Sequence, residues 1–513
     1  MKKSLCLILI ACLVTSMSHS QSNIIPSPKH AMPAKGTFAF SQDVSVTVPA
    51  EMNETAGIFA DEILKLTGAR PEIKAGTPGK GDIDLIIDRK ITGREEYELN
   101  ISPGGIELRA STGAGLFYGL QTIRQLLILS GKPEIPAMII KDSPRFEWRG
   151  VMLDVSRTFM PVNLVKRYID LFALYKLNVL HLHLTDDQGW RIEIKKYPLL
   201  TEVGSRFDAK YNCMGGYYSQ VEIRDLVRYA GMRNITIVPE IELPGHACAA
   251  LASYPWLSCS GIEPEIHTFF EGPGVHNEIF CAGKPEVYQF IFNVLDEIAG
   301  LFPSNYIHIG GDEAPKEEWK KCSFCQKIIR DNNLNNEEEL QSYFVKRIGE
   351  HLRTKNKLLT GWDEIYDGGR LKGDEILMYW RGWKAESVEK AAAQGFRIVA
   401  SPTTHCYFDY DYGKINTRTI FDYDPVPKDA SSEIRSRYIG VQANFWSHID
   451  RSEYNIDKQL FPRIFGLAET AWSIPGNHNW NEFRQAALKN GEYLKSRYIN
   501  VFPDESLVEM KLP

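Results

Sequence analysis

From Arg149 onward, short apolar runs alternate with longer stretches of helical periodicity, and this alternation limits the possible folds more than any other feature of the chain. The runs of strand length lie at 151–155, 179–184, 235–241, 306–309, 358–362, 376–380, 397–400 and 439–445. Between them apolar residues recur every three or four positions, and Pro161 and Pro285 mark the starts of two helices. Eight such units predict an α/β fold, a (β/α)8 barrel at residues 143–513.

The preceding residues, 21–142, have a different pattern and are expected to form a small α/β domain. Strands are predicted at 44–48 and 85–87, helices at 58–66 and 115–129, and a hairpin around Pro103-Gly-Gly105. Residue types that catalyse reactions are not concentrated in this part.

The first twenty residues have the features of an export signal. Lys2 and Lys3 precede an apolar run over 5–14, and Ser18-His-Ser20 resembles a cleavage site for a signal peptide of residues 1–20. About ten apolar residues are too few to span a bilayer, and no other run approaches the ~20 required. A periplasmic or secreted protein is expected, although Leu9-Ile-Ala-Cys12 also resembles a lipoprotein box, which would anchor the chain at Cys12.

Seven cysteines remain after residue 20: Cys213, Cys248, Cys259, Cys281, Cys322, Cys325 and Cys406. Export permits disulfides, and Cys259 and Cys281 are candidates for a bridge that closes a loop. Cys322-Ser-Phe-Cys325 has the spacing of a zinc or redox motif. No second pair stands at ligand spacing in the sequence, so a structural or unreactive pair is favoured.

Composition excludes several classes of protein. The 513 residues include 10 Trp, 23 Tyr and 24 Phe, which excludes disordered and low-complexity chains. The formal net charge is −6 and no basic cluster stands out, so a nucleic-acid partner is not expected.

Each predicted barrel strand is followed at once by residues that can bind or react. The segments are Asp154–Arg157, Asp186–Trp190, Glu240–His246, Gly310–Glu313, Trp362–Glu364, Trp380, His405–Asp409 and Trp446–His448. In a barrel of this kind the strand ends meet at one mouth, so these groups should converge. Carboxylates beside aromatic rings suggest a sugar site, because the rings stack on pyranose C–H faces and the carboxylates accept from hydroxyls.

A metal-dependent hydrolase is the rival interpretation. His181-Leu-His183 is the only close histidine pair, and both residues alternate with apolar neighbours inside a predicted strand. We interpret them as buried barrel histidines, and the reaction inferred below needs no metal or organic cofactor.

Three motifs resemble glycoside hydrolase family 20, the exo-acting β-N-acetylhexosaminidases. They are Tyr306-Ile-His-Ile-Gly-Gly-Asp-Glu313, Leu184-Thr-Asp-Asp-Gln-Gly-Trp-Arg191 and Pro244-Gly-His246. The Gly115–Ile123 segment is similar to part of the companion domain of that family, so the resemblance covers nearly the whole chain. It implies a barrel enzyme that acts on glycans ending in β-N-acetylhexosamine.

The resemblance implies a retaining, substrate-assisted mechanism, in which the 2-acetamido oxygen of the sugar is the nucleophile. Glu313 would be the general acid and then the general base, and Asp312 would orient the acetamido group. Asp312 and Glu313 are neighbours, which suits this mechanism better than one with carboxylates on opposite sides of the scissile bond.

The resemblance also implies roles for residues around this pair. Asp186 and His246 would be hydrogen bonded in series to the acid. The remaining candidates would contact the sugar: Arg157 and Asp409 at its outer hydroxyls, Tyr407 at the acetamido oxygen, and Trp362, Trp380 and Trp446 as aromatic walls.

Two positions depart from the family pattern. His448 stands where the family commonly has a glutamate that binds O4, so the gluco/galacto preference does not carry over. A cationic His448 would favour a sulfated or otherwise anionic sugar. Glu242 stands where the family often has aspartate.

Two alternatives use the same fold. One is a barrel β-N-acetylglucosaminidase that uses the adjacent Asp186 and Asp187 as its catalytic pair. The other is a glycan-binding protein without catalysis. The intact Asp312-Glu313 pair argues against it, because a protein that only binds glycans need not keep a general acid.

Overall fold

The computed structural model describes residues 23–76, 79, 81–206, 215–267, 274–449, 452–477 and 479–508. The expected signal peptide of residues 1–20, with Cys12, lies outside these ranges, and so does Cys213. Among the helices that are described, none is both long and apolar enough to cross a membrane.

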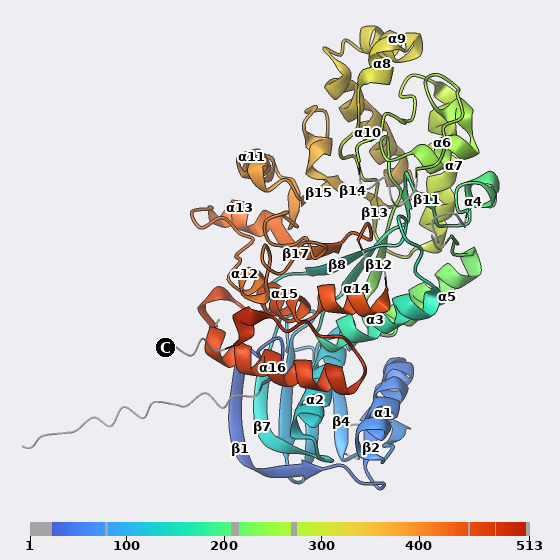
Figure 1. Cartoon of the computed structure of the whole chain (residues 1–513). Helices are drawn as coiled ribbons and strands as arrows, with labels where there is room; N and C mark the ends of the chain where they lie inside the picture. Colours follow the sequence, from blue (N-terminus) through green and yellow to red (C-terminus); the bar gives the residue numbers. More distant parts are fainter. Residues whose placement is uncertain are drawn as a thin grey trace, which may run out of the picture.

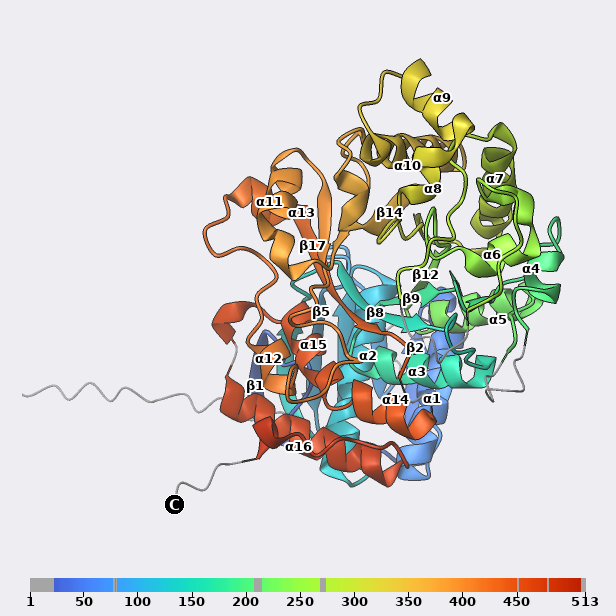
Figure 2. The same ribbon diagram turned by 45° about the horizontal axis from the view of Figure 1, so that its top comes forward.

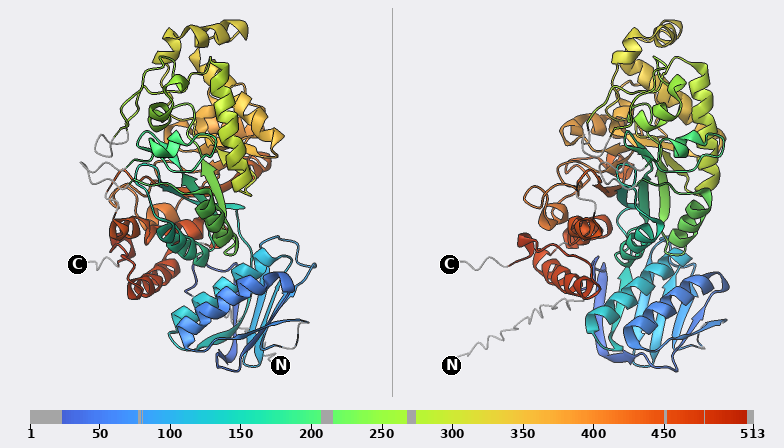
Figure 3. Two further views of the ribbon diagram at one scale, coloured as in Figure 1. Left: turned by 90° about the vertical axis from the view of Figure 1, so that its right-hand side faces the viewer. Right: turned by 45° about the vertical axis from the view of Figure 1, so that its right-hand side comes forward.

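The N-terminal domain is a seven-stranded mixed sheet with two helices packed against it (Figure 3). Its helices are α1 (Asn53–Thr67) and α2 (Gly113–Ser130). Its strands, in sheet order, are β1 (His30–Ala39), β7 (Glu134–Asp142), β5 (Tyr97–Ser102), β6 (Gly105–Ala110), β4 (Ile83–Ile87), β2 (Ser45–Val48) and β3 (Glu72–Ala75).

Six of these elements lie where the sequence predicts them, and the predicted α/β character is confirmed. The helix α2 illustrates why: Thr112 caps its first turn by accepting from the Gly115 N–H, and Gly131 ends it in a left-handed conformation. Strands β1, β3 and β7 were not predicted. β1 is mostly exposed and contains Pro33 and Gly36, so it lacks an apolar alternation.

The second part is a closed barrel of eight parallel strands, which confirms the predicted (β/α)8 fold (Figure 1). Each predicted apolar run coincides with one strand. In chain order these are β8 (Trp148–Asp154), β9 (Val179–His183), β12 (Thr236–Glu240), β13 (Tyr306–His308), β14 (Leu358–Trp362), β15 (Ile376–Tyr379), β16 (Arg397–Ala400) and β17 (Tyr438–Phe445).

Helices follow the barrel strands. Those that connect one strand to the next include α3 (Val162–Leu174), α5 (Gln220–Gly231), α7 (Pro285–Leu301), α10 (Glu337–Thr354) and α11 (Ala385–Ala393), and α15 (Arg463–Trp472) follows the last strand. Their starts follow local chemistry: α7 begins at Pro285, and α5 begins with a capping box between Ser219 and Glu222. The last long helix, α16 (Trp480–Ser496), returns to pack against α2 of the N-terminal domain (Figure 2).

A buried cluster of polar side chains links the two domains by hydrogen bonds and an ion pair. Asp142, the last residue of β7, accepts hydrogen bonds from Lys176 Nζ at 2.9 Å, Tyr97 Oη at 2.8 Å and Trp472 Nε1 at 2.9 Å. Burial alone would raise the pKa of Asp142, but the charge of Lys176 and the hydrogen bonds from Trp472 and Lys176 outweigh it and lower the pKa. The side chains of Asp142 and Lys176 are fully buried, so each charge depends on the other.

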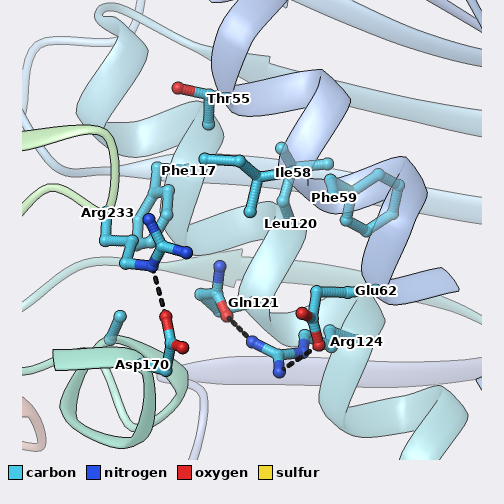
Figure 4. A pocket seen from close by; sticks show the side chains of 11 residues that line it. Thr55, Ile58, Phe59, Glu62, Phe117, Leu120, Gln121, Arg124, Asp170 and Arg233 are labelled. Carbon is cyan, nitrogen blue, oxygen red and sulfur yellow. Dashed lines mark hydrogen bonds and ion pairs between the residues drawn. The ribbon is translucent and has the colours of Figure 1, made fainter. Parts of the chain in front are cut away.

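A pocket also lies along this domain seam, between α1 and α2 on one side and α3 on the other (Figure 4). Its polar wall holds two ion pairs, Arg124 with Glu62 at 2.6 Å and Arg233 with Asp170. None of the residues predicted to act on a substrate lines it.

The cysteines correct one expectation. No disulfide is present among the described cysteines, so Cys259 and Cys281 are not bridged to each other. The fold instead brings both of them to Cys322 and Cys325, with all four sulfur atoms within 4.8 Å of one another. The sequence has no second pair at ligand spacing, but the fold brings two cysteines that are distant in sequence beside Cys322 and Cys325. The preference for a structural or unreactive pair stays a prediction.

Candidate active site

Two glycines form the turn between the end of β13 and the acidic pair Asp312 and Glu313. Gly310 and Gly311 have φ values of +67° and +95°, in the left-handed region. A Cβ at Gly310 would lie 1.6 Å from Glu242 Oε2, and one at Gly311 would lie 2.3 Å from an Ile365 methyl group. Only glycine fits these positions, and the turn presents the two carboxylates that follow to the space above the barrel.

Asp312 and Glu313 differ in exposure although they are neighbours. The side chain of Glu313 is 36% exposed, whereas that of Asp312 is 11% exposed. The Glu313 backbone N–H donates to Glu364 Oε2 at 2.7 Å, and Glu313 itself has a positive φ of +46°. One carboxylate is therefore open to a substrate oxygen and to water, and the other lies deeper.

His246 links this pair to a buried series of charges. Its Nε2 lies 3.5 Å from Glu313 Oε2 and 3.9 Å from Asp312 Oδ2. Its Nδ1 lies 3.3 Å from Asp186 Oδ1, and the other Asp186 oxygen lies 2.8 Å from Arg157 Nη2. Burial works to lower the pKa of His246, but Asp186 raises it well above its usual value, so the ring is an imidazolium at neutral pH.

Three buried carboxyl groups of the site, those of Asp312, Glu364 and Glu242, have raised pKa values. Burial raises the pKa of Asp312 to about 8; His246 opposes this shift, and the nearby charges of Glu364 and Glu313 add to it. Burial and the same crowding raise the pKa of Glu364 to about 7 and that of Glu242 well above its usual value. A site with this electrostatic character favours a ligand that brings a hydrogen-bond donor or a developing positive charge.

Four aromatic side chains stand beside the carboxylates. The rings of Trp362 and Trp446 are 5.8 Å apart between centroids, Tyr407 lies 6.2 Å from Trp446, and Trp380 stacks on Tyr407 at 6.3 Å. The indole N–H groups of all three tryptophans are buried and have no hydrogen-bond partner among the described residues. Such an apolar wall with free donors suits a ligand that has both C–H faces and polar groups.

Polar residues complete the rim. The Arg157 guanidinium lies 4.9 Å over the Trp446 ring, and His448 Nε2 lies 3.7 Å from Asp409 Oδ2. Burial raises the pKa of Asp409 to about 7. Burial and the Arg157 charge lower the pKa of His448, a shift toward the neutral imidazole. The cationic His448 considered from the sequence stays a prediction.

The structure brings the sequence-predicted site residues together at the carboxyl ends of the barrel strands. These are Arg157, Asp186, His246, Asp312, Glu313, Trp362, Trp380, Tyr407, Asp409, Trp446 and His448. They are far apart in the sequence, and the closed barrel brings them together in space.

Residues outside the set of roles implied by the family resemblance also shape the site. Glu364 accepts from the Glu313 backbone N–H, and Asp363 accepts from the Trp380 N–H at 2.9 Å and from Arg381 Nε at 2.7 Å. Asp187, considered from the sequence only as half of an alternative catalytic pair, contacts His246 Nδ1 at 3.1 Å. For Asp363 and Glu364 the only signal in the sequence was their position just after a predicted strand, whereas Asp187 lies in the Leu184–Arg191 motif.

The barrel histidines contact buried polar side chains. His183 contacts Glu240 Oε2 at 2.5 Å through Nδ1 and Asp186 Oδ2 at 2.8 Å through Nε2, while His181 Nδ1 bonds to Gln442 at 3.0 Å. Both histidines are fully buried. This arrangement fits barrel-interior residues that support the floor of the site.

The geometry disfavours Asp186 and Asp187 as a catalytic pair. Both side chains are about 1% exposed. Asp186 is occupied by Arg157, His183 and His246, and Asp187 accepts from the Cys248 N–H at 3.0 Å as well as contacting His246. Neither carboxylate is free to reach a substrate.

Two family models and several known proteins match this chain. Residues 146–475 match the model of the glycosyl hydrolase family 20 catalytic domain, and residues 21–143 match the model of domain 2 of that family. A β-hexosaminidase of Porphyromonas gingivalis is 37% identical over 92% of this chain, which spans 65% of that protein. A β-hexosaminidase of Akkermansia muciniphila is 33% identical over 89% of this chain and 94% of its own length.

Among solved structures, the family 20 exo-β-N-acetylglucosaminidase of Vibrio harveyi in complex with N-acetylglucosamine superposes with a TM-score of 0.83. It is 30% identical to this chain, and the match covers 94% of this chain and 78% of the other. The similarity therefore includes the small N-terminal domain as well as the barrel.

Proposed function

Because the chain belongs to glycoside hydrolase family 20, we propose that it is an exo-acting, retaining β-N-acetylhexosaminidase that releases terminal GlcNAc or GalNAc from glycans. The observation that carries the proposal is the placement of Asp312 and Glu313 on one turn, both facing His246 and beside the aromatic wall. The names of the relatives support the substrate class.

In the first step the 2-acetamido oxygen attacks the anomeric carbon and the glycosidic bond breaks. Glu313, the more exposed carboxyl of the pair, gives its proton to the leaving oxygen. Asp312 accepts from the acetamido N–H and stabilises the positive charge of the oxazolinium intermediate. The raised pKa of Asp312 supports this role. In the free protein few groups stabilise its carboxylate form, and the acetamido N–H and the positive charge of the bound substrate would provide that stabilisation.

In the second step water attacks the anomeric carbon while Glu313 takes its proton. The bond from that carbon to the acetamido oxygen breaks, which opens the oxazolinium ring with net retention of configuration. The Tyr407 hydroxyl, buried beside Trp446, holds the acetamido oxygen in line for the first attack. His246, charged and fixed by Asp186, stabilises the Glu313 carboxylate whenever the proton has left.

Substrates with progressively fluorinated acetamido groups test the proposed nucleophile. Fluorine weakens the carbonyl oxygen as a nucleophile, so kcat/KM should fall with each fluorine added. A flat series would contradict the participation of the acetamido group. Exo action is tested on a linear trisaccharide of β-linked GlcNAc, which should release only monosaccharide at first.

Paired variants test the assignment of the acid. Glu313→Gln should lower kcat by about 10²–10⁴-fold on substrates with poor leaving groups, and less on activated aryl glycosides. Asp187→Asn is the matched comparison, since it would have the larger effect if Asp186 and Asp187 were the catalytic pair. Near-normal activity of Glu313→Gln would refute the proposal, and lack of all turnover in the unmodified protein would favour a glycan-binding role.

We also propose export of the protein to the periplasm or the medium, on the basis of the basic and apolar pattern of residues 1–20. Lipid attachment at Cys12 is the alternative. Fractionation of the native host, with a Cys12→Ser variant beside it, distinguishes soluble from membrane-bound protein.

A further inference from the structure

Four cysteines converge from two barrel loops at the end of the molecule far from the N-terminal domain (Figure 1). Cys259 and Cys281 belong to the loop after β12. Cys322 and Cys325 lie where the short helix α8 (Glu317–Lys321) meets α9 (Ser323–Asp331), in the loop after β13. Three of these residues are buried, and Cys259 is partly exposed.

The distances between the sulfur atoms have a chemical meaning. Cys281 Sγ lies 3.7 Å from Cys325 Sγ and 3.8 Å from Cys322 Sγ, and Cys259 Sγ lies 3.8 Å from Cys325 Sγ. A disulfide requires about 2.05 Å. Four thiolates around Zn²⁺ at about 2.3 Å form a tetrahedron whose edges are about 3.8 Å.

The two loops pack closely together beside the sulfur atoms. A Cβ at Gly283 would lie 2.2 Å from the carbonyl carbon of Phe324, so the two loops touch backbone to backbone beside the cluster. The Cys-x-x-Cys spacing at 322–325 is common in structural zinc sites.

The same two loops carry the catalytic groups. Phe280 N–H donates to the carbonyl oxygen of Pro244, two residues before His246, and the Phe280 carbonyl accepts from Trp319 Nε1. Trp319 lies six residues after Glu313. A link between Cys281 and Cys322 or Cys325 therefore ties the segment that supports His246 to the segment that follows Glu313.

We propose that Cys259, Cys281, Cys322 and Cys325 bind one Zn²⁺ and that this ion clamps the loops after β12 and β13 together. Binding converts the four thiols to thiolates, releases their protons and transfers no electrons. Since sulfur occupies every position of the tetrahedron, the ion has no open site for water and its role is structural.

Metal content of the full-length protein, purified without a metal-affinity step, is the direct test. Elemental analysis should find about one zinc per chain, and a mercurial reagent should release it as the thiols react. The unreduced intact mass should match fully reduced cysteines at these four positions. Two disulfides, seen as the loss of four hydrogens, or four free thiols without zinc after incubation with Zn²⁺ would overturn the proposal.

Variants separate metal binding from packing. Cys325→Ser should lower zinc affinity at least about tenfold and lower the unfolding temperature. Cys325→His should retain zinc, because three thiolates and one imidazole also form a structural zinc site. Cys406→Ala, at a buried cysteine outside the cluster, is the control and should keep full zinc content. Equal zinc content in Cys325→Ser and the control would contradict the assignment.

Discussion

Replacement of Asp312 by asparagine should abolish efficient hydrolysis and at the same time stabilise the free enzyme at alkaline pH. The carboxyl group is buried against Glu364 and Glu313, and its pKa is raised from 3.8 to about 8. A carboxyl with a raised pKa stabilises the fold while it is protonated. In the unfolded chain this carboxyl ionises near pH 4, whereas in the folded chain it keeps its proton up to about pH 8. Between these two values each rise in pH favours the unfolded state, so the free energy of unfolding falls.

The size of the effect follows from the shift. Each pKa unit corresponds to about 1.4 kcal/mol, so ionisation of Asp312 costs at most about 6 kcal/mol above pH 8. Water that enters beside the partly exposed Glu313 screens part of this cost, and we expect a gain of about 2–4 kcal/mol for Asp312→Asn. At about pH 5 most of the gain should be absent, because the free energy difference accumulates from the unfolded pKa near 4 up to the folded pKa of about 8 and only about one pH unit of it is then present.

Thermal unfolding of both proteins across about pH 5 to 9 measures this difference. The variant should unfold a few degrees higher than the wild type at the alkaline end, and the two curves should approach each other as the pH falls. Asp429→Asn, at an exposed aspartate, is the control and should change nothing. A pH-independent difference, or a variant less stable at pH 9, would refute the electrostatic reasoning.

Three further predictions concern other parts of the molecule. Asp142→Leu should lower the free energy of unfolding by about 3–5 kcal/mol by leaving Lys176 buried without a partner, and adding Lys176→Met should recover much of it in a denaturant titration. Tyr407→Phe keeps the aromatic wall but removes the hydroxyl, so steady-state kinetics should show kcat reduced about 10²-fold with little change in KM. His448→Glu places a second carboxylate near Asp409 and should alter the ratio of rates on GlcNAc and GalNAc aryl glycosides; an unchanged ratio would exclude His448 from sugar selection.

The barrel was predictable because its strands are buried on both faces and therefore read as continuous apolar runs. Strand β1 was not predictable, since its partner β7 stabilises it by backbone pairing while most of its side chains face solvent. The α/β character of the first domain followed from α1, α2 and the central strands alone.

The site residues that follow barrel strands could be listed in advance because the fold dictates where strand ends meet. Contacts between side chains that are distant in the sequence could not be predicted. Glu364 accepts from the Glu313 backbone N–H and lies in the short 3-10 helix after β14. The two cysteines that approach Cys322 and Cys325 are 22 positions apart, Cys259 and Cys281. Neither spacing carries a local signal.

His246 and Glu313 share a positive φ, +47° and +46°, a conformation that costs any residue other than glycine about 1 kcal/mol or more. Sequence design guided by folding stability alone would therefore choose glycine at both positions, and asparagine at Asp312. A designed barrel of this type would be sturdier and inert. Engineers who stabilise the enzyme should hold these three positions fixed and look for their gains elsewhere in the chain.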